Sequence, residues 1–196
     1  MTHEFDKNYW EGHWQQGAGA MERNPVNPYL VEAVSGLTPG RGGGTESGLA
    51  LEAGCGAGTE AMWLASQGWQ VTGVDISADA LGRASRRAAG SGVAERVAWV
   101  EADLTEWSPS TQYGLVTTHY AHPSIPQLAF YERISRWVAP GGTLFIVGHL
   151  HHSVTEVSVA EISGVLGDPW EIVRAEEKTR MHGGHELHDV VVQAVR

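Results

Sequence analysis

Residues 49–60 read LALEAGCGAGTE, and residues 69–76 read WQVTGVDI. The apolar start of the first stretch is typical of a strand that is buried on both faces. Three glycines follow it, and glycines let the backbone turn tightly and let a ligand approach without a Cβ in the way. The second stretch reaches Asp75, an acid that can accept hydrogen bonds from both hydroxyls of a ribose. A strand, a glycine turn, a helix and a second strand closed by an acid predict a nucleoside-binding βαβ unit.

The glycine spacing departs from the dinucleotide-binding pattern. The glycines run G-x-G-x-G, so the third lies one residue too early for G-x-G-x-x-G. A turn that binds a pyrophosphate is therefore the weaker interpretation. For the turn taken alone, any nucleotide-binding α/β domain remains an alternative.

Periodicity and turn residues predict strands that alternate with helices along most of the chain. Alternation of this kind predicts a parallel, doubly wound sheet of the α/β class, and two later β-rich runs joined through a glycine pair predict a closing hairpin. The expected strands are residues 49–53, 69–75, 96–100, 113–118 and 143–148, with hairpin strands at 170–178 and 186–195. The expected helices are residues 6–16, 27–35, 58–67, 77–90, 124–138 and 158–166.

We expect a single domain over residues 1–196, because a chain of 196 residues can bury one good core and has no length to spare for a second. Residues 1–48 would form N-terminal cap helices and a glycine-rich linker. Residues 49–152 would form the ligand-binding core, and residues 153–196 a C-terminal helix and hairpin.

Charge and hydropathy limit the expected partners. With 13 Lys and Arg against 23 Asp and Glu, the net charge of -10 would repel a phosphate backbone, so we expect no nucleic-acid partner. No apolar run approaches membrane-spanning length, and the N-terminus lacks the basic and apolar regions of a signal peptide. We therefore expect a cytoplasmic protein without membrane insertion that binds a small molecule. The sequence leaves a homodimer open.

The chain resembles the class I S-adenosylmethionine-dependent methyltransferases in motifs that follow one another in the family's order. The matching residues are Glu52, Gly54, Gly56 and Gly58 for E/D-x-G-x-G-x-G, Asp75 for the ribose-binding acid, residues 101–104 (EADL) for the acidic tetrapeptide that frames the adenine, and residues 139–142 (APGG) for the turn before the fifth strand.

This resemblance implies a fold, a cofactor and a set of contact residues. The fold is Rossmann-like, with a doubly wound, mostly parallel, seven-stranded sheet and a C-terminal antiparallel hairpin strand. The implied activity is methyl transfer from S-adenosylmethionine, with the glycines next to the methionine end of the donor and Asp75 on its ribose. The residues implied to border the donor are Trp14, Glu52, Gly54, Gly56, Gly58, Asp75, Ile76, Ala102, Asp103, Leu104 and His119.

The two ends of the chain resemble small-molecule branches of this family. Residues 9–14 (YWEGHW) are similar to the opening of the thiopurine and tellurite-resistance types. Trp10 and Trp14 are four residues apart on one helix face, where they could cover the sulfonium or anchor the helix. The part after His149 resembles small actinobacterial methyltransferases of unassigned, sugar or lipid-precursor substrates.

Histidines are concentrated in three short stretches. Eight of the ten lie at residues 119–122, 149–152 and 182–188. Loops at the carboxyl ends of parallel strands carry the ligand sites, and the first two stretches are such loops. If the hairpin is kept, the third lies at the same end, so we expect all three to crowd one rim above the donor.

A hydroxyl acceptor loses its proton as it attacks the methyl group, and an imidazole can take that proton at neutral pH. We therefore predict that His122, His149 or His152 acts as the base or orients the acceptor, which would be a sugar, a lipid precursor or a phenol. Three alternatives stay open. A thiol, selenium or tellurium acceptor would need no base. A nucleoside-binding protein could keep the fold without catalysis. A divalent metal could bind where imidazoles and acids converge, from His149, His151, His185, His188, Glu186 and Asp189.

Overall fold

The computed structural model describes residues 5–21, 25–40, 48–150, 157–182 and 185–196. Its strands are β1 Leu49–Ala53, β2 Gln70–Asp75, β3 Val97–Glu101, β4 Tyr113–His119, β5 Val138–His149, β6 Glu171–His182 and β7 His185–Val195. Its helices are α1 Lys7–Met21, α2 Pro28–Val34, α3 Thr59–Ser66, α4 Ala78–Ser91, α5 Gln127–Ser135 and α6 Val159–Leu166, with a short 3-10 turn at Ala94–Arg96.

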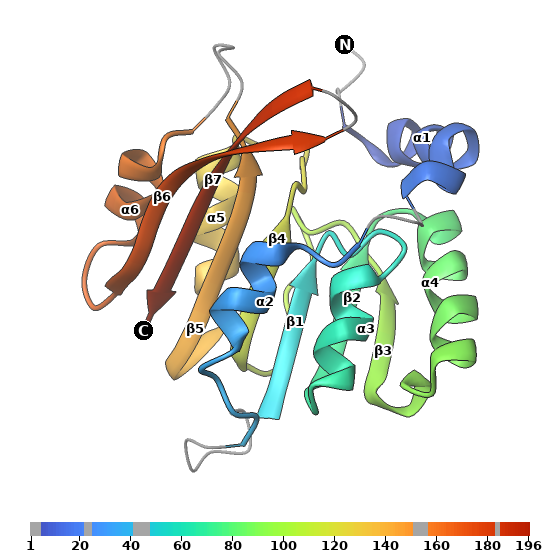
Figure 1. Ribbon diagram of the computed structural model, residues 1–196, viewed down its shortest axis with the longest axis horizontal. Helices are drawn as coiled ribbons and strands as arrows, with labels where there is room; N and C mark the ends of the chain where they lie inside the picture. Colours follow the sequence, from blue (N-terminus) through green and yellow to red (C-terminus); the bar gives the residue numbers. More distant parts are fainter. Residues whose placement is uncertain (1–4, 22–24, 41–47, 151–156, 183–184) are drawn as a thin grey trace.

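The strands form one seven-stranded sheet in the order β3-β2-β1-β4-β5-β7-β6 (Figure 1). From β3 to β5 every pair is parallel, whereas β7 is antiparallel to both β5 and β6. Because the order reverses between β1 and β4, the carboxyl ends of these two strands open a crevice for a ligand. The predicted doubly wound sheet with its closing hairpin is confirmed.

The sheet has a hydrophobic core on each face. On one face α2 and α3 pack over β1, β4 and β5, with Leu30 and Phe145 fully buried. On the other face α5 packs over β5, and α6 packs beside α5 over β6 and β7, with Phe130 and Ile162 fully buried. Both faces are covered, so the central strands read as continuous apolar runs.

The fifth strand begins earlier than the sequence predicts. Residues 139–142 were expected as a turn before a strand at 143–148, but Val138 already pairs with Tyr113, and the register then shifts to Leu115 opposite Thr143. The APGG run is therefore a bulge inside β5, with Gly141 at φ 76°.

The boundaries of two helices also differ from the prediction. Helix α5 starts only after Pro126, at Gln127 and not at residue 124, because the residue before a proline is kept out of the helical region. Helix α1 continues to Met21, past the expected end at residue 16. The glycines beyond residue 16 disfavour a helix, which is why the prediction stopped there.

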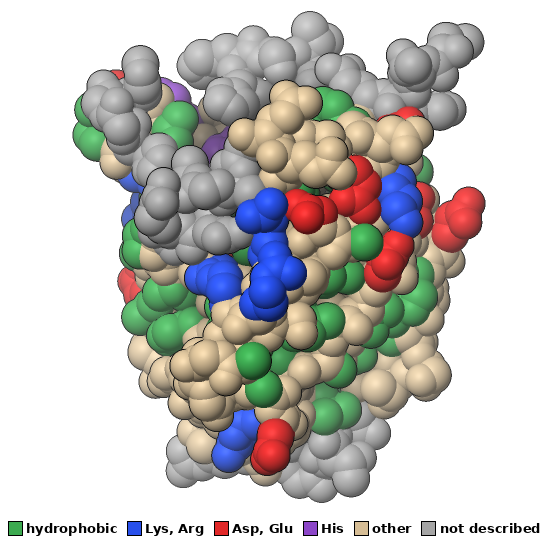
Figure 2. All heavy atoms as spheres, turned by 90° about the vertical axis from the view of Figure 1, so that its right-hand side faces the viewer, with side chains coloured by type: hydrophobic (Ala, Val, Ile, Leu, Met, Phe, Trp, Pro, Cys, Tyr) green, Lys and Arg blue, Asp and Glu red, His purple; other side chains and the backbone are tan. Residues whose placement is uncertain are grey.

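Three arginines between residues 83 and 87 lie on α4, and two of them make contacts that hold the fold. Arg87 donates to the Ala57 carbonyl at 2.6 Å, and Arg83 pairs with Asp79 at 2.9 Å. Figure 2 shows Lys and Arg side chains gathered on this side of the molecule with Asp and Glu side chains close by. Among the described residues, no helix has the length and apolar composition to cross a membrane.

Helix α1 is fixed to the start of α4 by one carboxylate. Glu11 accepts hydrogen bonds from the Ser77 hydroxyl at 3.0 Å and from the amides of Ala78 and Asp79 at 2.8 and 3.3 Å. These amides have no partner inside their own helix, and a negative charge is favourable at a helix N-terminus. Glu11 therefore holds α1 across the open end of the sheet.

We expect Glu11→Gln to loosen α1 without unfolding the core. Losing a charged cap of about 1 kcal/mol corresponds to roughly fivefold faster opening. Hydrogen exchange of the α1 amides measures this. Lys7→Gln is the matched control on the same helix, because it removes only an exposed ion pair with Glu101 and should leave exchange unchanged. Equal exchange in all three proteins would show that Glu11 does not hold the helix.

Candidate active site

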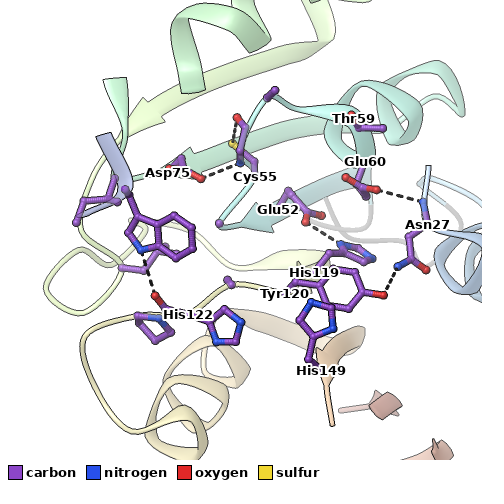
Figure 3. Close-up of a pocket in the computed structure, with 18 of the residues that line it drawn as sticks. Asn27, Glu52, Cys55, Thr59, Glu60, Asp75, His119, Tyr120, His122 and His149 are labelled. Atoms are coloured by element: carbon purple, nitrogen blue, oxygen red, sulfur yellow. Dashed lines mark hydrogen bonds and ion pairs between the residues drawn. The ribbon is translucent and has the colours of Figure 1, made fainter. Parts of the chain in front are cut away.

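A pocket of about 550 Å³ opens at the carboxyl ends of β1, β2 and β4, beneath α1 (Figure 3). Of the predicted site residues, the pocket wall contains Trp14, Glu52, Gly54, Gly56, Asp75, Ile76, Asp103, Leu104, His119, His122 and His149. Gly58 and Ala102 do not line it, since Gly58 faces Trp99 and Ala102 packs against the core. His152 lies outside the described residues.

The glycine turn is seated on β2 by backbone hydrogen bonds. The amides of Gly54 and Cys55 both donate to the Val74 carbonyl, at 2.9 and 3.0 Å, and the Gly56 amide donates to the Asp75 carboxylate at 2.7 Å. Gly56 has φ 51°, and a Cβ there would lie 2.7 Å from the Trp14 ring. Glycine at this position therefore admits the α1 tryptophan as well as the unusual backbone conformation.

Asp75, the acid that the motifs assign to the ribose, lies in the pocket wall. Its carboxylate lines the pocket, is 8% exposed as a residue, and accepts from the amides of Gly56 and Ser77. Burial raises the pKa of Asp75, and the hydrogen bonds from Ser77 and Gly56 only partly oppose this effect. Ile76 and Leu104 add apolar surface nearby in the same wall.

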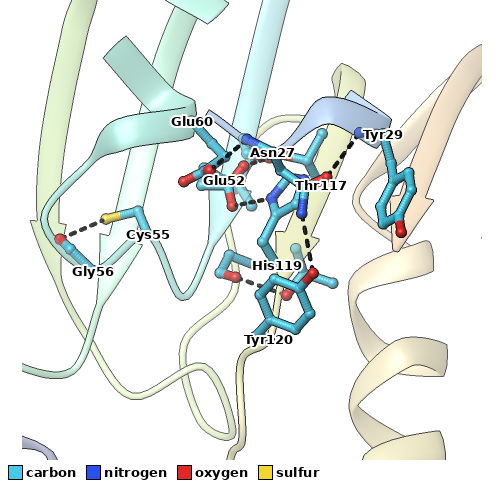
Figure 4. A network of polar contacts seen from close by, with 12 residues as sticks. Asn27, Tyr29, Glu52, Cys55, Gly56, Glu60, Thr117, His119 and Tyr120 are labelled. Carbon is cyan, nitrogen blue, oxygen red and sulfur yellow. Dashed lines mark hydrogen bonds and ion pairs between the residues drawn. The ribbon is translucent and has the colours of Figure 1, made fainter. Parts of the chain in front are cut away.

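A second acidic group forms the inner wall (Figure 4). Glu52 is 1% exposed, hydrogen bonds to the Thr117 hydroxyl, and lies 2.8 Å from Nδ1 of His119. Burial lowers the pKa of His119, but the charge and hydrogen bond of Glu52 outweigh burial, so the net shift is upward. Nε2 of His119 is buried and has no hydrogen-bond partner among the described residues.

The sequence did not single out two residues of this wall. The carboxylate of Glu60 accepts a hydrogen bond from the backbone amide of Asn27 at 3.1 Å. Burial raises the pKa of Glu60. Asn27 caps α2, as its position in a turn into a helix suggested, and also donates to the Tyr120 hydroxyl at 3.3 Å. No local pattern marks this second role, because its partner lies far along the chain.

The opposite side of the pocket is built around Tyr120. Tyr120 follows β4 and has φ 55°, which is uncommon for a residue with a side chain. Its hydroxyl donates to Asp189 at 3.1 Å, and burial raises the pKa of Tyr120, so the phenol stays neutral. The His149 ring stacks on it with the centroids 4.2 Å apart, and Arg180 lies over the same ring at 5.4 Å.

The histidine rim forms only in part. His119, His122 and His149 line one pocket, and the rings of His122 and His149 stack at 6.3 Å. His188 does not line the pocket, and its side chain is 42% exposed. His151 and the side chains of His182 and His185 lie outside the description. Within the described ranges, no three His, Cys, Asp or Glu side chains come together as a metal site.

The two N-terminal tryptophans both reach the pocket. Trp14 is buried against the glycine turn, and Nε1 of Trp10 donates to the His122 carbonyl at 3.3 Å. They therefore anchor α1 and also contribute to the wall. The sequence left open whether they cover the sulfonium or anchor the helix; these contacts show the anchoring role, and covering the sulfonium stays a prediction.

Comparison with known proteins identifies the class. A family model described as a methyltransferase domain matches residues 50–142. Thiocyanate methyltransferase 1 of Arabidopsis thaliana is 31% identical over 80% of this chain and 70% of its own length, and probable thiol methyltransferase 2 of the same plant is 26% identical over 93% and 75%. Magnesium protoporphyrin IX methyltransferase from Synechocystis PCC 6803 with bound SAM has the same fold, with a TM-score of 0.71 at 19% identity over all of both chains.

The fold and the pocket define a nucleoside-binding α/β enzyme. The matching family model and these relatives show that the chain belongs to the class I S-adenosylmethionine-dependent methyltransferases of the small-molecule type, as the motifs predicted. S-adenosylmethionine is its methyl donor.

The residues present fit this donor. S-adenosylmethionine is positively charged at its sulfonium and its amino group, and the pocket wall carries the carboxyl groups of Glu52, Glu60, Asp75 and Asp103. Opposite charge in a buried pocket favours binding. Asp75 would hold the ribose, Ile76 and Leu104 would border the adenine, and Trp14 would cover the donor from α1.

We expect Gly56→Ala to weaken binding of the demethylated cofactor at least tenfold. The new Cβ would displace Trp14 in addition to the cost of a left-handed backbone, about 1 kcal/mol. Gly92→Ala is the matched control, because Gly92 has φ 77° and nothing within 4 Å of its Cβ position. Calorimetric titration measures the cofactor affinity of both variants. It thus compares a strained backbone that also clashes with Trp14 with a strained backbone that clashes with nothing. Equal affinities would argue against a binding role for Trp14.

Affinity for the cofactor should decrease as the pH is lowered, and because the pKa of Asp75 is raised, this decrease should begin at a higher pH than it would for an ordinary aspartate. Ribose hydroxyls donate to the ionised form of Asp75, and its raised pKa means that it becomes protonated earlier as the pH drops. Asp75→Asn should lower affinity roughly ten- to a hundredfold near pH 7. Binding titrations from about pH 7.5 to about pH 5 should show a steeper loss of affinity for the wild type than for Asp75→Asn. Glu60 has a raised pKa too, and because Asp75→Asn keeps Glu60, the comparison removes its contribution. Parallel curves would remove Asp75 as the titrating group.

Proposed function

We propose that this enzyme methylates a small protic acceptor, most simply the hydroxyl of a phenol, sugar or lipid precursor, with His149 as the general base. The observation that carries the proposal is the placement of His122 and His149. Their rings stack at 6.3 Å in the wall of the donor pocket, away from the Asp75 side (Figure 3). His119 is less suited to this role, because Glu52 engages its Nδ1 and its side chain is only 5% exposed.

The chemistry explains why a base is useful here. When bound, S-adenosylmethionine supplies an electrophilic methyl group. A hydroxyl is a weak nucleophile until its proton leaves, and a positioned base contributes about 10²–10⁴-fold to the rate. The side chain of His149 is 24% exposed and so can be reached from the pocket. Helix α1, fixed by Glu11, would keep water from the reacting groups.

A thiol or another soft acceptor is the second candidate. The names of two relatives, a thiocyanate methyltransferase and a probable thiol methyltransferase, favour it. Arg180 also lines the pocket, and its positive charge would attract an anionic nucleophile. A thiol with an ordinary pKa of about 8.5 is partly ionised near neutral pH, so its methylation would depend little on a histidine base.

His149→Gln separates the two candidates. With phenol as the probe acceptor, we expect the turnover rate to fall about 10²-fold or more, while affinity for the cofactor stays nearly unchanged. In the wild type, the logarithm of the rate should rise with pH while the base loses its proton and then level off. With benzyl mercaptan as the probe, the variant should keep most of its rate.

His122→Gln tests the neighbouring ring, and His188→Gln is the control outside the pocket. A chelator added to each assay separates a base from a metal, since only a metal site loses activity on chelation. Methylation of phenol at the wild-type rate by His149→Gln would refute the base. Methylation of benzyl mercaptan but not of phenol by the wild-type enzyme would favour the second candidate.

A further inference from the structure

The buried carboxylate of Asp189 lies beside the proposed base. Asp189 is on β7 directly opposite His149 on β5, and its side chain has no exposed surface. One of its oxygens, Oδ1, is 3.5 Å from Nδ1 of His149. This separation is at the limit of a hydrogen bond, and such contacts at catalytic sites often shorten when substrates bind.

The other carboxylate oxygen is already engaged. Oδ2 accepts from Nε of Arg180 at 2.6 Å and from the Tyr120 hydroxyl at 3.1 Å. The two donors fix the orientation of the carboxylate and leave Oδ1 toward the imidazole. Burial raises the pKa of Asp189, but the nearby His149 imidazole and the hydrogen bond and charge of Arg180 outweigh burial and hold the pKa below its ordinary value. Asp189 is therefore an anion at neutral pH.

Tyr120 fixes the plane of the imidazole. Its ring stacks on the His149 ring with an interplanar angle of 21°, and its hydroxyl is held by both Asp189 and Asn27. A side-chain-bearing residue at φ 55° costs about 1 kcal/mol or more, and such strain is common where a side chain must be held in one position. The His149 ring thus has a stacking partner on one face and a carboxylate at one edge.

We propose that Asp189 is a positioning residue, which holds the proton of neutral His149 on Nδ1 and leaves Nε2 to receive the proton of the acceptor. The inference rests on the proposed role of His149 as base. The proton of the acceptor hydroxyl moves to Nε2, and an electron pair of the acceptor oxygen forms the new bond to the methyl carbon. The electron pair of the broken carbon–sulfur bond stays on the sulfur of the donor. The ionisable groups that the described contacts place beside the His149 ring are Asp189, Tyr120 and His122, and Arg180 pairs with Asp189 and lies over the Tyr120 ring.

The protonation of His149 can be measured without an acceptor. In enzyme with ¹⁵N-labelled histidine and bound demethylated cofactor, long-range ¹H–¹⁵N spectra distinguish the two neutral tautomers, and His149→Gln assigns the signal. We expect the Nδ1–H tautomer in the wild type and a shift toward the other tautomer in Asp189→Asn. The Nε2–H tautomer in the wild type, or the same spectrum in Asp189→Asn, would overturn the proposal.

A double-mutant cycle on turnover of phenol tests whether Asp189 acts through His149. Asp189→Asn should lower kcat roughly ten- to a hundredfold with a nearly unchanged KM, as expected for a lost charged hydrogen bond. In the His149→Gln background, the same change should have little further effect. Glu177→Gln, an exposed acid on the neighbouring strand, is the matched control and should turn over normally.

Two further variants cover the possibility that Asp189→Asn is unstable. Tyr120→Phe keeps the ring and removes one hydrogen bond to the carboxylate, so a partial loss of kcat is expected. Asp189→Asn with Arg180→Gln removes the buried carboxylate and its cationic partner together and should still lose the Nδ1–H preference. Thermal unfolding and cofactor affinity confirm that each variant is folded. If His149→Gln is fully active, the proposed base is wrong. If His149→Gln is inactive while folded Asp189 variants keep the wild-type kcat and tautomer, only the role of Asp189 is wrong.

Discussion

The hydrogen bond from the Gly56 amide to the Asp75 carboxylate joins the parts on which the donor pocket depends. It ties the glycine turn after β1 to the end of β2, beside the two amides that donate to the Val74 carbonyl. The same carboxylate accepts from Ser77, whose hydroxyl in turn donates to Glu11 on α1. The position of the turn, the start of α4 and the placement of the N-terminal helix are therefore linked through one buried acid.

The side of the pocket on which we place the acceptor, around His149 and Tyr120, depends on a different constraint, the direction of β7. An antiparallel strand beside β5 brings Asp189 opposite His149, and the adjoining hairpin strand supplies Arg180 to the same carboxylate. A parallel strand in this place would have put its carboxyl end at the rim instead. The hairpin thus closes the sheet, places the buried Asp189 behind His149 and brings Arg180, which pairs with Asp189, into the pocket wall.

Much of the donor half could be predicted, because its signals are local. The apolar run of β1, the glycines and Asp75 lie close together in the sequence, and each reflects a requirement of its own backbone or strand end. The bulge in β5 could not be predicted, since a Pro-Gly-Gly run reads as a turn unless the pairing of Val138 with Tyr113 is known. Similarly, the glycines suggested close approach by a ligand, whereas the space at Gly56 is occupied by Trp14.

The contacts of the acceptor half could not be predicted, because they are set by register between distant strands. Histidine clustering identified the rim, yet it did not distinguish His119, which is engaged by Glu52, from His149, which is engaged by Asp189. The left-handed conformation of Tyr120 has no sequence signal either, since a tyrosine is not a residue that favours it.

The two sides of the pocket differ in the kind of contact that holds them together. On the donor side, backbone contacts hold the glycine turn and the starts of the neighbouring elements, so we expect substitutions there to disturb the fold as well as the site. The acceptor half is made of side chains mounted on complete strands, and their replacement leaves the sheet pairing intact. On the proposed role of His149, substitutions at His149 and Arg180 would change the acceptor chemistry while the same fold continues to bind the same donor.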